Sequence, residues 1–462
     1  MNLETLLARH GKVGGPARAA LVGAGEFGAS FVAQARKSGE VEVCVICDLD
    51  PERAVRAALA AGHAPEEVRP CPDRASAEQA LADGAIAVVR DVALATALPV
   101  DAVLEATGDP EGAARTARLA IEAGRHVVMA TKEAEVVVGP ILAHRAAERG
   151  VVHTPVDGDQ PSLLIGLVGW ARSLGFTVVC AGKASESDFV WDGRGDRVTA
   201  WGRTESSPGL AGAFRLEDGE PDAVLATRAR APFARTTVPD LCEMGIVANH
   251  TGLAPDRPDL HAPIARTVEL PTLFRPRAAG GLLADIGRVD MFNCLRRPDE
   301  LSFAGGVFVV VEAPDAATGR LLRAKGLPTC PDGRYVLLHN PVHLLGAEAL
   351  ASVIAASRLG CSTGGVMPRQ HIDLVGRASR DLEPGERLSI GTRHVIDGLD
   401  HRLEPARTLA PSAPVPYYLA DGAVVRRRVA VGSCPTLEDL ELRSESVLQR
   451  LRSEQDRELG VG

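Results

Sequence analysis

Leu21-Val22-Gly23-Ala24-Gly25-Glu26-Phe27-Gly28, near the start of the chain, is the stretch of sequence that decides the fold. It ends an apolar run that begins at Arg18 and predicts a buried strand, and it leads into a helical pattern over residues 29–37. The three glycines allow a tight turn, and they let the backbone approach a diphosphate at the N-terminus of the helix. The stretch therefore predicts a dinucleotide-binding loop.

An acidic residue at the end of the next strand supports this interpretation. Asp48 lies 20 residues after Gly28, where a carboxylate can accept hydrogen bonds from the adenosine ribose. Strand, glycine loop, helix, strand and acid occur in the order that dinucleotide binding requires. A carboxylate at this place repels a 2′-phosphate and favours NAD, whereas Arg53, in the next helix, could accept that phosphate. The predicted cofactor is therefore NADP or NAD.

The strand and helix patterns continue to alternate as far as residue 155, which predicts a doubly wound parallel sheet. Residues that follow such strands face the cofactor crevice. Thr107-Gly108, Thr131-Lys132-Glu133 and residues 157–161 occupy such places. The predicted cofactor contacts are Gly23, Gly25, Glu26, Phe27, Gly28, Asp48, Thr107, Gly108 and Lys132.

Composition and charge narrow the choice of partners. The net charge is −9 and aromatic residues make up 3% of the chain, which argues against nucleic acid and anionic lipid. No apolar run approaches the roughly 20 residues of a membrane span, and the first residues lack the order of a signal peptide. We expect a cytoplasmic protein that acts on a small molecule and binds neither nucleic acid nor membrane.

Lysine is rare in this chain, since only five of the 51 basic residues are Lys. Arg cannot lose its proton, so a retained Lys can mark a place where proton transfer is needed. Lys132 and Lys183 each lie at the end of a predicted strand, and both are candidate proton donors to a developing alkoxide. A surface lysine in a salt bridge is the alternative for each.

Several stretches resemble known oxidoreductases. The glycine loop and the strands after it look like the Rossmann domain of homoserine dehydrogenases. Residues 158–161 (Gly-Asp-Gln-Pro), 181–183 (Ala-Gly-Lys) and 243–253 (Glu-Met-Gly-Ile-Val-Ala-Asn-His-Thr-Gly-Leu) resemble the deoxyxylulose-phosphate-reductoisomerase-like oxidoreductases. A weak internal duplication, residues 380–388 against 427–435, resembles the SAF domain that such proteins carry.

The resemblance implies an α/β protein with three domains. These are a Rossmann doubly wound parallel sheet over 1–155, an α+β catalytic and oligomerisation domain over 156–360, and a small β-rich SAF-like domain over 361–462. It also implies a helix near 341–357 that returns to the Rossmann domain, and a homo-oligomer. The implied activity is NAD(P)-dependent hydride transfer at a CH–OH or C=O group of a sugar-phosphate-like substrate.

The chain departs from the family pattern in places that matter for the substrate. Pro239 stands where the family usually has a lysine, and Gly166 stands where a Glu is usual. Residues 339–344 (His-Asn-Pro-Val-His-Leu) replace a Tyr-Arg-Pro-Tyr-His-Leu segment, so a phosphate contact through Arg is missing. The substrate therefore need not be deoxyxylulose phosphate.

Polar residues in the three reductoisomerase-like stretches, together with Lys132 and Asp157, are candidates for the site. Lys183, Lys132, Asp159 and Glu243 are the predicted catalytic residues, and Asp157, Gln160 and Asn249 are the predicted substrate contacts. Asp157, Asp159 and Glu243 could hold a divalent metal through hard oxygen ligands. Because Asp is also a good N-cap for the helix that begins near Pro161, capping is the favoured interpretation for one of the two aspartates, and no metal site is predicted.

Two functions remain open on the sequence. The first is an NAD(P)-dependent oxidoreductase acting on a small polyhydroxylated or phosphorylated carbonyl or alcohol. The second is a non-catalytic Rossmann-plus-SAF protein that binds a nucleotide or a sugar, which the missing family lysine and arginine would fit. The glycine loop and the lysines at strand ends favour the enzyme.

Overall fold

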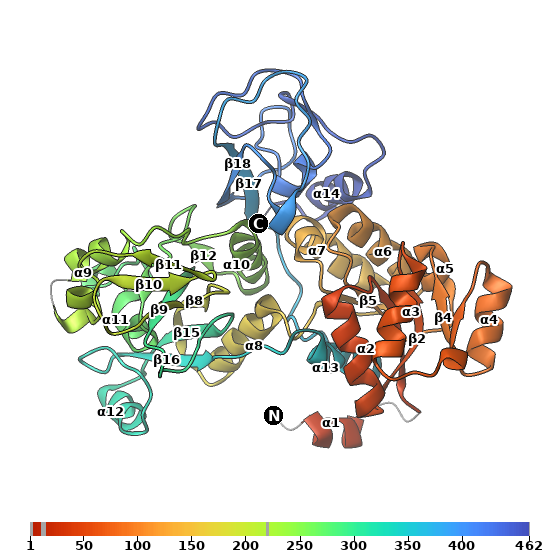
Figure 1. The fold of residues 1–462 in the computed structure, drawn as a ribbon, viewed down its shortest axis with the longest axis horizontal. Coiled ribbons are helices and arrows are strands. Elements are labelled where there is room, and N and C mark those ends of the chain that lie inside the picture. Colours follow the sequence, from red (N-terminus) through yellow and green to blue (C-terminus); the bar gives the residue numbers. More distant parts are fainter. Residues whose placement is uncertain (1–2, 11–14, 219–220, 462) are drawn as a thin grey trace. The chain divides into compact units, whose positions relative to one another are not determined.

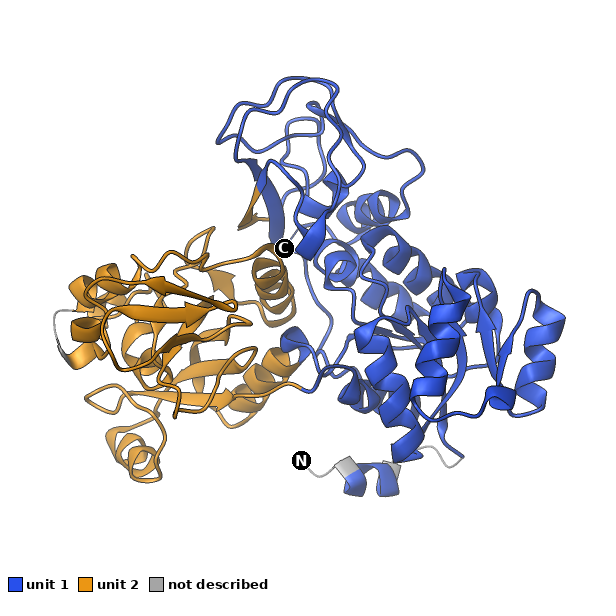
Figure 2. Ribbon diagram, in the orientation of Figure 1, with its two compact units in different colours: residues 1–162, 344–399, 406–462 blue, residues 163–343, 400–405 orange. Residues whose placement is uncertain are grey.

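The computed structural model describes residues 3–10, 15–218 and 221–461. The chain divides into two compact units (Figure 2). Unit 1 comprises residues 1–162, 344–399 and 406–462, and unit 2 comprises residues 163–343 and 400–405. The chain thus leaves unit 1 after the Rossmann portion, builds unit 2, and returns for most of its last 120 residues. The predicted three-domain boundaries at 155 and 360 stay predictions.

The predicted doubly wound sheet is confirmed in unit 1 (Figure 1). Seven parallel strands lie in the order β3-β4-β2-β1-β5-β6-β7. Their bounds are β1 (Ala17–Val22), β2 (Val41–Cys47), β3 (Val68–Pro70), β4 (Ile86–Val89), β5 (Ala102–Glu105), β6 (His126–Met129) and β7 (His153–Pro155). The strands are apolar on both faces because helices cover both.

Helices of unit 1 cover this sheet. The strand order reverses beside β1, which is where such sheets bind ligands. The helices of unit 1 are α1 (Leu3–His10), α2 (Glu26–Ser38), α3 (Pro51–Ala60), α4 (Arg74–Ala82), α5 (Val92–Ala97), α6 (Pro110–Glu122), α7 (Lys132–Glu148), α13 (Ala349–Ile354) and α14 (Val447–Glu458). α13 packs against α2 and β1, although it comes more than 300 residues later in the chain.

Unit 2 is a mixed sheet in the order β11-β10-β9-β14-β8-β15-β16, flanked by helices. Its strands are β8 (Thr177–Ala184), β9 (Phe189–Trp191), β10 (Arg197–Ala200), β11 (Arg203–Ser206), β12 (Ala254–Pro255), β13 (Ile264–Ala265), β14 (Arg288–Arg296), β15 (Val307–Glu312) and β16 (Tyr335–Asn340). Its helices are α9 (Pro221–Arg228), α10 (Val238–Thr251), α11 (Leu270–Leu273) and α12 (Ala316–Ala324), together with most of α8 (Gln160–Ser173). Stacked and edge-on phenylalanines, among them Phe292 and Phe308, fill its core.

The C-terminal region contains short strands and turns followed by a helix, as the sequence predicts. The strands are β17 (Ile372–Ala378), β18 (Leu399–Pro405), β19 (Val424–Val425) and β20 (Leu440–Glu441). The two duplicated stretches pair with each other, because Leu382 and Val429 exchange two backbone hydrogen bonds of 3.0 Å. This antiparallel bridge joins equivalent halves of the duplication.

Three predicted elements differ from the structure. The long helix expected over 341–357 starts later, as a 3-10 turn at Leu345–Ala347 followed by α13 and a π-helical turn at Ala355–Leu359. The sequence predicts an amphipathic terminal helix over 438–459, with Val447, Leu448 and Leu451 on one face, but this helix starts at Val447, where Ser446 caps it. Residues 184–238 are rich in Gly, Asp, Pro and Arg and lack clear periodicity, which predicts a long loop. Their described part instead contains β9, β10, β11 and α9. Their strands are only three or four residues long, too short for periodicity to reveal.

A buried ion-pair cluster attaches α14 to the C-terminal region. The guanidinium of Arg452 is fully buried and donates to both oxygens of Asp373, at 2.6 and 2.9 Å, and to Asp456 at 2.8 Å. We expect Asp373→Ala to lower the free energy of unfolding by ~3–5 kcal/mol, because it leaves a buried cation short of its main partner. Urea unfolding measures this.

The exposed pair of Arg427 and Glu438 provides the control. Glu438→Ala should change the free energy of unfolding by no more than ~1 kcal/mol, since exposed ion pairs contribute little. A similarly small loss in Asp373→Ala would show that the buried cluster does not stabilise the fold.

Within the described residues, no helix is both long enough and apolar enough to cross a membrane.

Candidate active site

The glycine loop between β1 and α2 has the geometry of a dinucleotide-binding turn. Gly23 has φ +98°, and a Cβ there would lie 2.5 Å from the carbonyl oxygen of Ala106. A Cβ at Gly28 would lie 2.3 Å from the carbonyl oxygen of Gly23. A Cβ at Gly25 would meet no atom within 4 Å, so this glycine is not needed for packing. It leaves open the N-terminus of α2, where an anion is favoured.

Asp48 is bound to this loop. One carboxylate oxygen accepts from the backbone N–H of Ala24 and the other from that of Asp50, both at 2.8 Å. The side chain is buried, while Glu26 and Gly25 on the loop are exposed. Asp48 therefore fixes the loop's conformation and adds negative charge beside it.

A second set of polar groups lies where β5 and β6 end. Glu105 is fully buried at the end of β5 and accepts from the backbone N–H of Thr107 at 2.9 Å and from its hydroxyl at 2.5 Å. The backbone N–H of Gly108 donates to the Thr131 hydroxyl at 2.9 Å. The other Glu105 oxygen, Oε2, is buried and has no hydrogen-bond partner within the described part of the chain.

Burial also affects the charge of the acidic groups here. It raises the pKa of Glu105 to about 7 and that of Glu133 to about 7, because a desolvated carboxylate is disfavoured in its charged form. Lys132, the first residue of α7, opposes the shift at Glu133 and lies 3.7 Å from Asp159. Buried acids that titrate near neutrality are typical of functional sites.

These shifts predict a pH-dependent stability. The unfolded state binds fewer protons than the folded state between about pH 4.5 and 7, so stability falls as the pH rises through this window. Gln mimics the protonated acid. We expect Glu105→Gln to weaken this pH dependence. At pH 8 the free energy of unfolding of the variant should be higher than that of the wild type, by about 3 kcal/mol at most.

Urea unfolding at pH 5 and pH 8 tests this, with Glu66→Gln, at an exposed position, as the control. Equal pH dependence in the Glu105→Gln variant and the wild type would contradict a raised pKa at Glu105.

The residues after β7 form a compact polar turn. The Asp157 carboxylate accepts from the Ser162 hydroxyl at 2.5 Å, and its backbone N–H donates to the Ser352 hydroxyl at 2.8 Å. Burial raises the pKa of Asp157. Asp159 immediately precedes α8 and accepts from the backbone N–H of Gln160 at 3.0 Å. Both carboxylates thus accept hydrogen bonds from residues in the first turn of α8.

Lys183 lies at the centre of the polar cluster in unit 2. It is fully buried on β8, and its Nζ lies 2.9 Å from Asp240 Oδ1, 3.3 Å from Glu186 Oε1 and in direct contact with Glu243 Oε2. Asp240 and Glu243 are buried on α10, whereas nearly half of the Glu186 side chain is exposed. The three carboxylates stabilise the ammonium ion, and Glu186 connects it to the surface.

The local sequence explains how Asp240 is aimed at Lys183. Thr237 caps α10, and Asp240 Oδ2 accepts from the backbone N–H of Thr237 at 2.9 Å and from its hydroxyl at 2.7 Å. This reciprocal capping box uses one carboxylate oxygen and leaves the other facing Lys183. One turn further on, Glu243 lies on the same face of the helix.

Asn249 is buried in the last turn of α10, which ends at Thr251 with Gly252 in the left-handed conformation. His401 lies near the other end of this helix, with its Nε2 3.3 Å from the Thr236 hydroxyl. Burial lowers the pKa of His401, and Asp240 opposes this. Lys183, Asn249 and His401 therefore lie along or beside α10.

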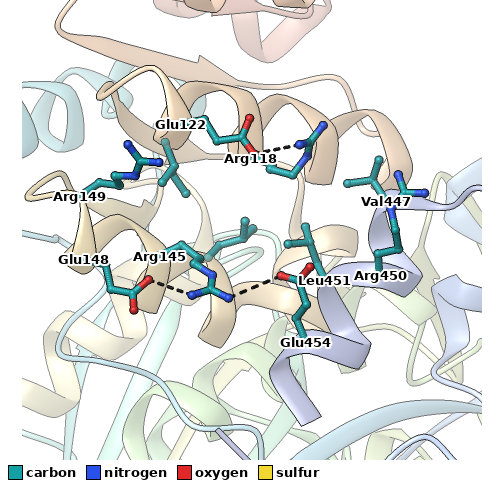
Figure 3. Close-up of a pocket in the computed structure, with 11 residues that line it drawn as sticks. Arg118, Glu122, Arg145, Glu148, Arg149, Val447, Arg450, Leu451 and Glu454 are labelled. Atoms are coloured by element: carbon teal, nitrogen blue, oxygen red, sulfur yellow. Dashed lines mark hydrogen bonds and ion pairs between the residues drawn. The ribbon is translucent and has the colours of Figure 1, made fainter. Parts of the chain in front are cut away.

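A separate cavity of about 420 Å³ opens between α6, α7 and α14 (Figure 3). Arg145 crosses it and pairs with Glu148 and Glu454. The cavity lies beside the C-terminal ends of α6 and α7, hence at the edge of the sheet away from the glycine loop. It is therefore not the cofactor site.

In the described residues, no group of three or more His, Cys, Asp or Glu side chains is arranged to hold a metal ion. Each acid considered as a metal ligand has another partner: Ser162 for Asp157, the backbone N–H of Gln160 for Asp159, and Lys183 for Glu243.

The Rossmann topology, the glycine loop and the sequence comparisons together define an NAD(P)-dependent oxidoreductase. Residues 158–349 match the family model of the oxidoreductase DRL catalytic domain. The chain is 27% identical over 297 residues to the 1-deoxy-D-xylulose 5-phosphate reductoisomerase of Pseudomonas syringae pv. syringae (strain B728a), covering 56% of this chain and 73% of that protein. The predicted resemblance to reductoisomerase-like oxidoreductases is confirmed.

The solved structures match a smaller part of this chain than the reductoisomerase does. Biliverdin reductase from Synechocystis sp. PCC 6803 has a TM-score of 0.25 at 19% identity, over 38% of this chain and 48% of that one. The WlbA dehydrogenase from Bordetella pertussis has a TM-score of 0.27 at 21% identity, over 38% and 47%. Myo-inositol dehydrogenase from Lactobacillus casei has a TM-score of 0.28 at 15% identity, over 39% and 49%. The chain thus spans about half the length of these proteins, and such partial likeness says nothing about the substrate.

The structure places the predicted residues in three groups, two in unit 1 and one in unit 2. Gly23, Gly25, Gly28 and Asp48 lie together in the glycine loop, and the second group of unit 1 lies at the ends of β5, β6 and β7. Lys183 and Glu243 meet in unit 2. Their roles stay predictions. Asp240 and Glu186 were missed, although Asp240 follows Pro239 in a capping pattern that the sequence displays.

Proposed function

We propose that the chain transfers a hydride between a nicotinamide dinucleotide and a small polyhydroxylated or phosphorylated carbonyl or alcohol. Unit 1 supplies the cofactor site through the glycine loop, and unit 2 supplies the proton through Lys183. When bound, the nicotinamide gives up or accepts the hydride. The residues of the chain bind the diphosphate, hold the substrate oxygen and move one proton.

The observation that carries this proposal is the environment of Lys183. Reduction of a carbonyl places negative charge on its oxygen, and a buried ammonium donor stabilises that charge far better than one in water. With the cofactor bound, Lys183 Nζ would donate its proton to the substrate oxygen, and the product would be the alcohol. Glu186, partly exposed and 3.3 Å away, provides the route by which a proton returns from solvent.

The glycine loop fits a dinucleotide on the protein's own geometry. The open space above Gly25 and the start of α2 suit a diphosphate, because Gly25 is the N-cap of this helix and no described side chain makes a capping hydrogen bond there. Asp48 offers negative charge next to this site, whereas exposed Arg53 offers positive charge. Parallel titrations with NAD and NADP decide between the two cofactors.

The test of the proposal is a screen of NADPH and NADH oxidation against small hydroxy-carbonyl compounds, including sugar phosphates. Turnover that disappears in a Lys183 variant supports the proposal. Dinucleotide binding without turnover on any substrate would favour the non-catalytic alternative, with which the full burial of Lys183 is also compatible.

We also propose the finer features that the family resemblance implies. These are a SAF-like tail over 361–462, a homo-oligomer and a cytoplasmic location. The bridge between Leu382 and Val429 supports the duplicated architecture of the tail. Light scattering of the purified chain measures its oligomeric state.

A further inference from the structure

A short turn in the C-terminal region, residues 390–396, is fixed by hydrogen bonds at both of its ends. Ile390 and Ile396 form an antiparallel bridge, and the backbone N–H of Gly391 donates to the Val395 carbonyl at 2.8 Å. The turn is anchored to the tail by two further bonds. Ile396 N–H donates to the hydroxyl of buried Tyr417 at 2.8 Å, and Ile390 N–H donates to Asp421 at 2.9 Å.

The tip of this turn is strained. Arg393 has φ +57° and His394 has φ +60°, both in the left-handed region that residues with a Cβ disfavour. Such strain clusters at functional sites. The turn places the His394 side chain beside Glu133 and Gly108.

His394 lies beside residues that follow β5 and β6. Its Nδ1 is 3.1 Å from Glu133 Oε1, and its Cε1 would lie 3.4 Å from a Cβ built on Gly108. Its side chain is 37% exposed, while that of Glu133 is buried. The ring therefore lies between solvent and a buried acid, over a glycine that the sequence predicts to contact the cofactor.

Two atoms of this pair have no hydrogen-bond partner in the described part of the chain. They are Glu133 Oε1 and His394 Nδ1, which approach each other without hydrogen-bond geometry. Buried polar atoms are nearly always paired, so unpaired ones point to a missing partner or to a rearrangement. Glu105 Oε2, at the end of β5, is a third buried atom without a hydrogen-bond partner in the described part of the chain.

The charges around His394 favour proton exchange. Burial lowers the pKa of His394, and Lys132 adds to this shift. The charged groups around His394 are Lys132 and Glu133 at the start of α7, Glu105 at the end of β5 and Asp159 before α8. The pKa of His394 is lowered and that of Glu133 is raised, so the two groups exchange protons as a coupled pair.

We propose that His394 is a positioning residue of the cofactor site: the tail turn places its imidazole against the bound dinucleotide, and its pairing with Glu133 links dinucleotide binding to proton exchange. This inference rests on the proposed function. The proposal therefore assigns the C-terminal tail a role in cofactor binding.

The test is titration calorimetry of the full chain with NADPH and NADH at pH 6, 7 and 8, in buffers of different ionisation enthalpy. The comparison is between wild type, His394→Asn and His144→Asn. His144 is the matched control, because its side chain is 36% exposed and lies 3.4 Å from Glu148. We expect His394→Asn to weaken binding about tenfold and to abolish the linked proton exchange near pH 7, while His144→Asn changes neither.

Carbethoxylation of histidines, located by mass spectrometry, gives a second measurement that does not depend on activity. The dinucleotide should protect His394 and leave His144 reactive. Unchanged affinity and proton exchange in His394→Asn, or a His394 that is not protected, overturns this inference while dinucleotide binding stands. If the wild-type chain binds neither dinucleotide, the proposed function fails and this inference fails with it.

Discussion

Replacing Lys183 with methionine is expected to lower kcat by roughly 10²–10⁴-fold, the usual contribution of a general acid. Methionine retains much of the side-chain volume but has no proton to give. Steady-state kinetics on the substrate found by the oxidation screen measures the effect. A proton donor acts in the transition state, so the loss should appear in kcat more than in KM.

Stability must be separated from catalysis in this variant. Without the ammonium ion, Asp240 and Glu243 lie buried next to each other without a cation, which destabilises unit 2. The double variant Lys183→Met with Glu243→Gln removes one of these charges, so it should recover stability and stay inactive. Lys325→Met, at an exposed lysine, should have wild-type activity. Activity within tenfold of wild type in a folded Lys183→Met chain would show that Lys183 is not the donor.

Replacing Gly25 with valine is expected to weaken dinucleotide binding by at least tenfold without lowering the melting temperature. A Cβ at this position meets no protein atom within 4 Å, so the fold tolerates it. The added side chain occupies the space that a diphosphate needs above the start of α2. Fluorescence titration with NADPH and thermal unfolding measure the two effects.

Gly23→Ala is the contrasting variant. Its Cβ would collide with the carbonyl of Ala106, and its φ of +98° is strained for alanine, so it should lower the melting temperature. Unchanged affinity in Gly25→Val would mean that the cofactor does not approach the glycine loop.

The Rossmann sheet was predictable from sequence because its signals are local. Each strand is a short apolar run, and the glycine loop requires specific residues at fixed spacing. Asp48 was found by its spacing from Gly28. Within unit 2, Lys183 was found because lysine is rare in this chain, and Glu243 because it lies in a stretch that resembles the reductoisomerase-like proteins.

The remaining parts depend on contacts between distant residues. Glu133 lies beside His394, which comes 261 residues later and has no local sequence signal. α13 joins the Rossmann sheet after an excursion of 181 residues through unit 2. The strands of residues 184–238 are too short for periodicity, and their pairing alone defines them.

The most direct measurement of the central claim is titration calorimetry of the purified full-length chain with NADH and NADPH. We expect saturable binding of at least one of them, with one dinucleotide per chain, and its loss in Gly25→Val. Absence of binding for both reduced and oxidised forms of both dinucleotides would contradict the account.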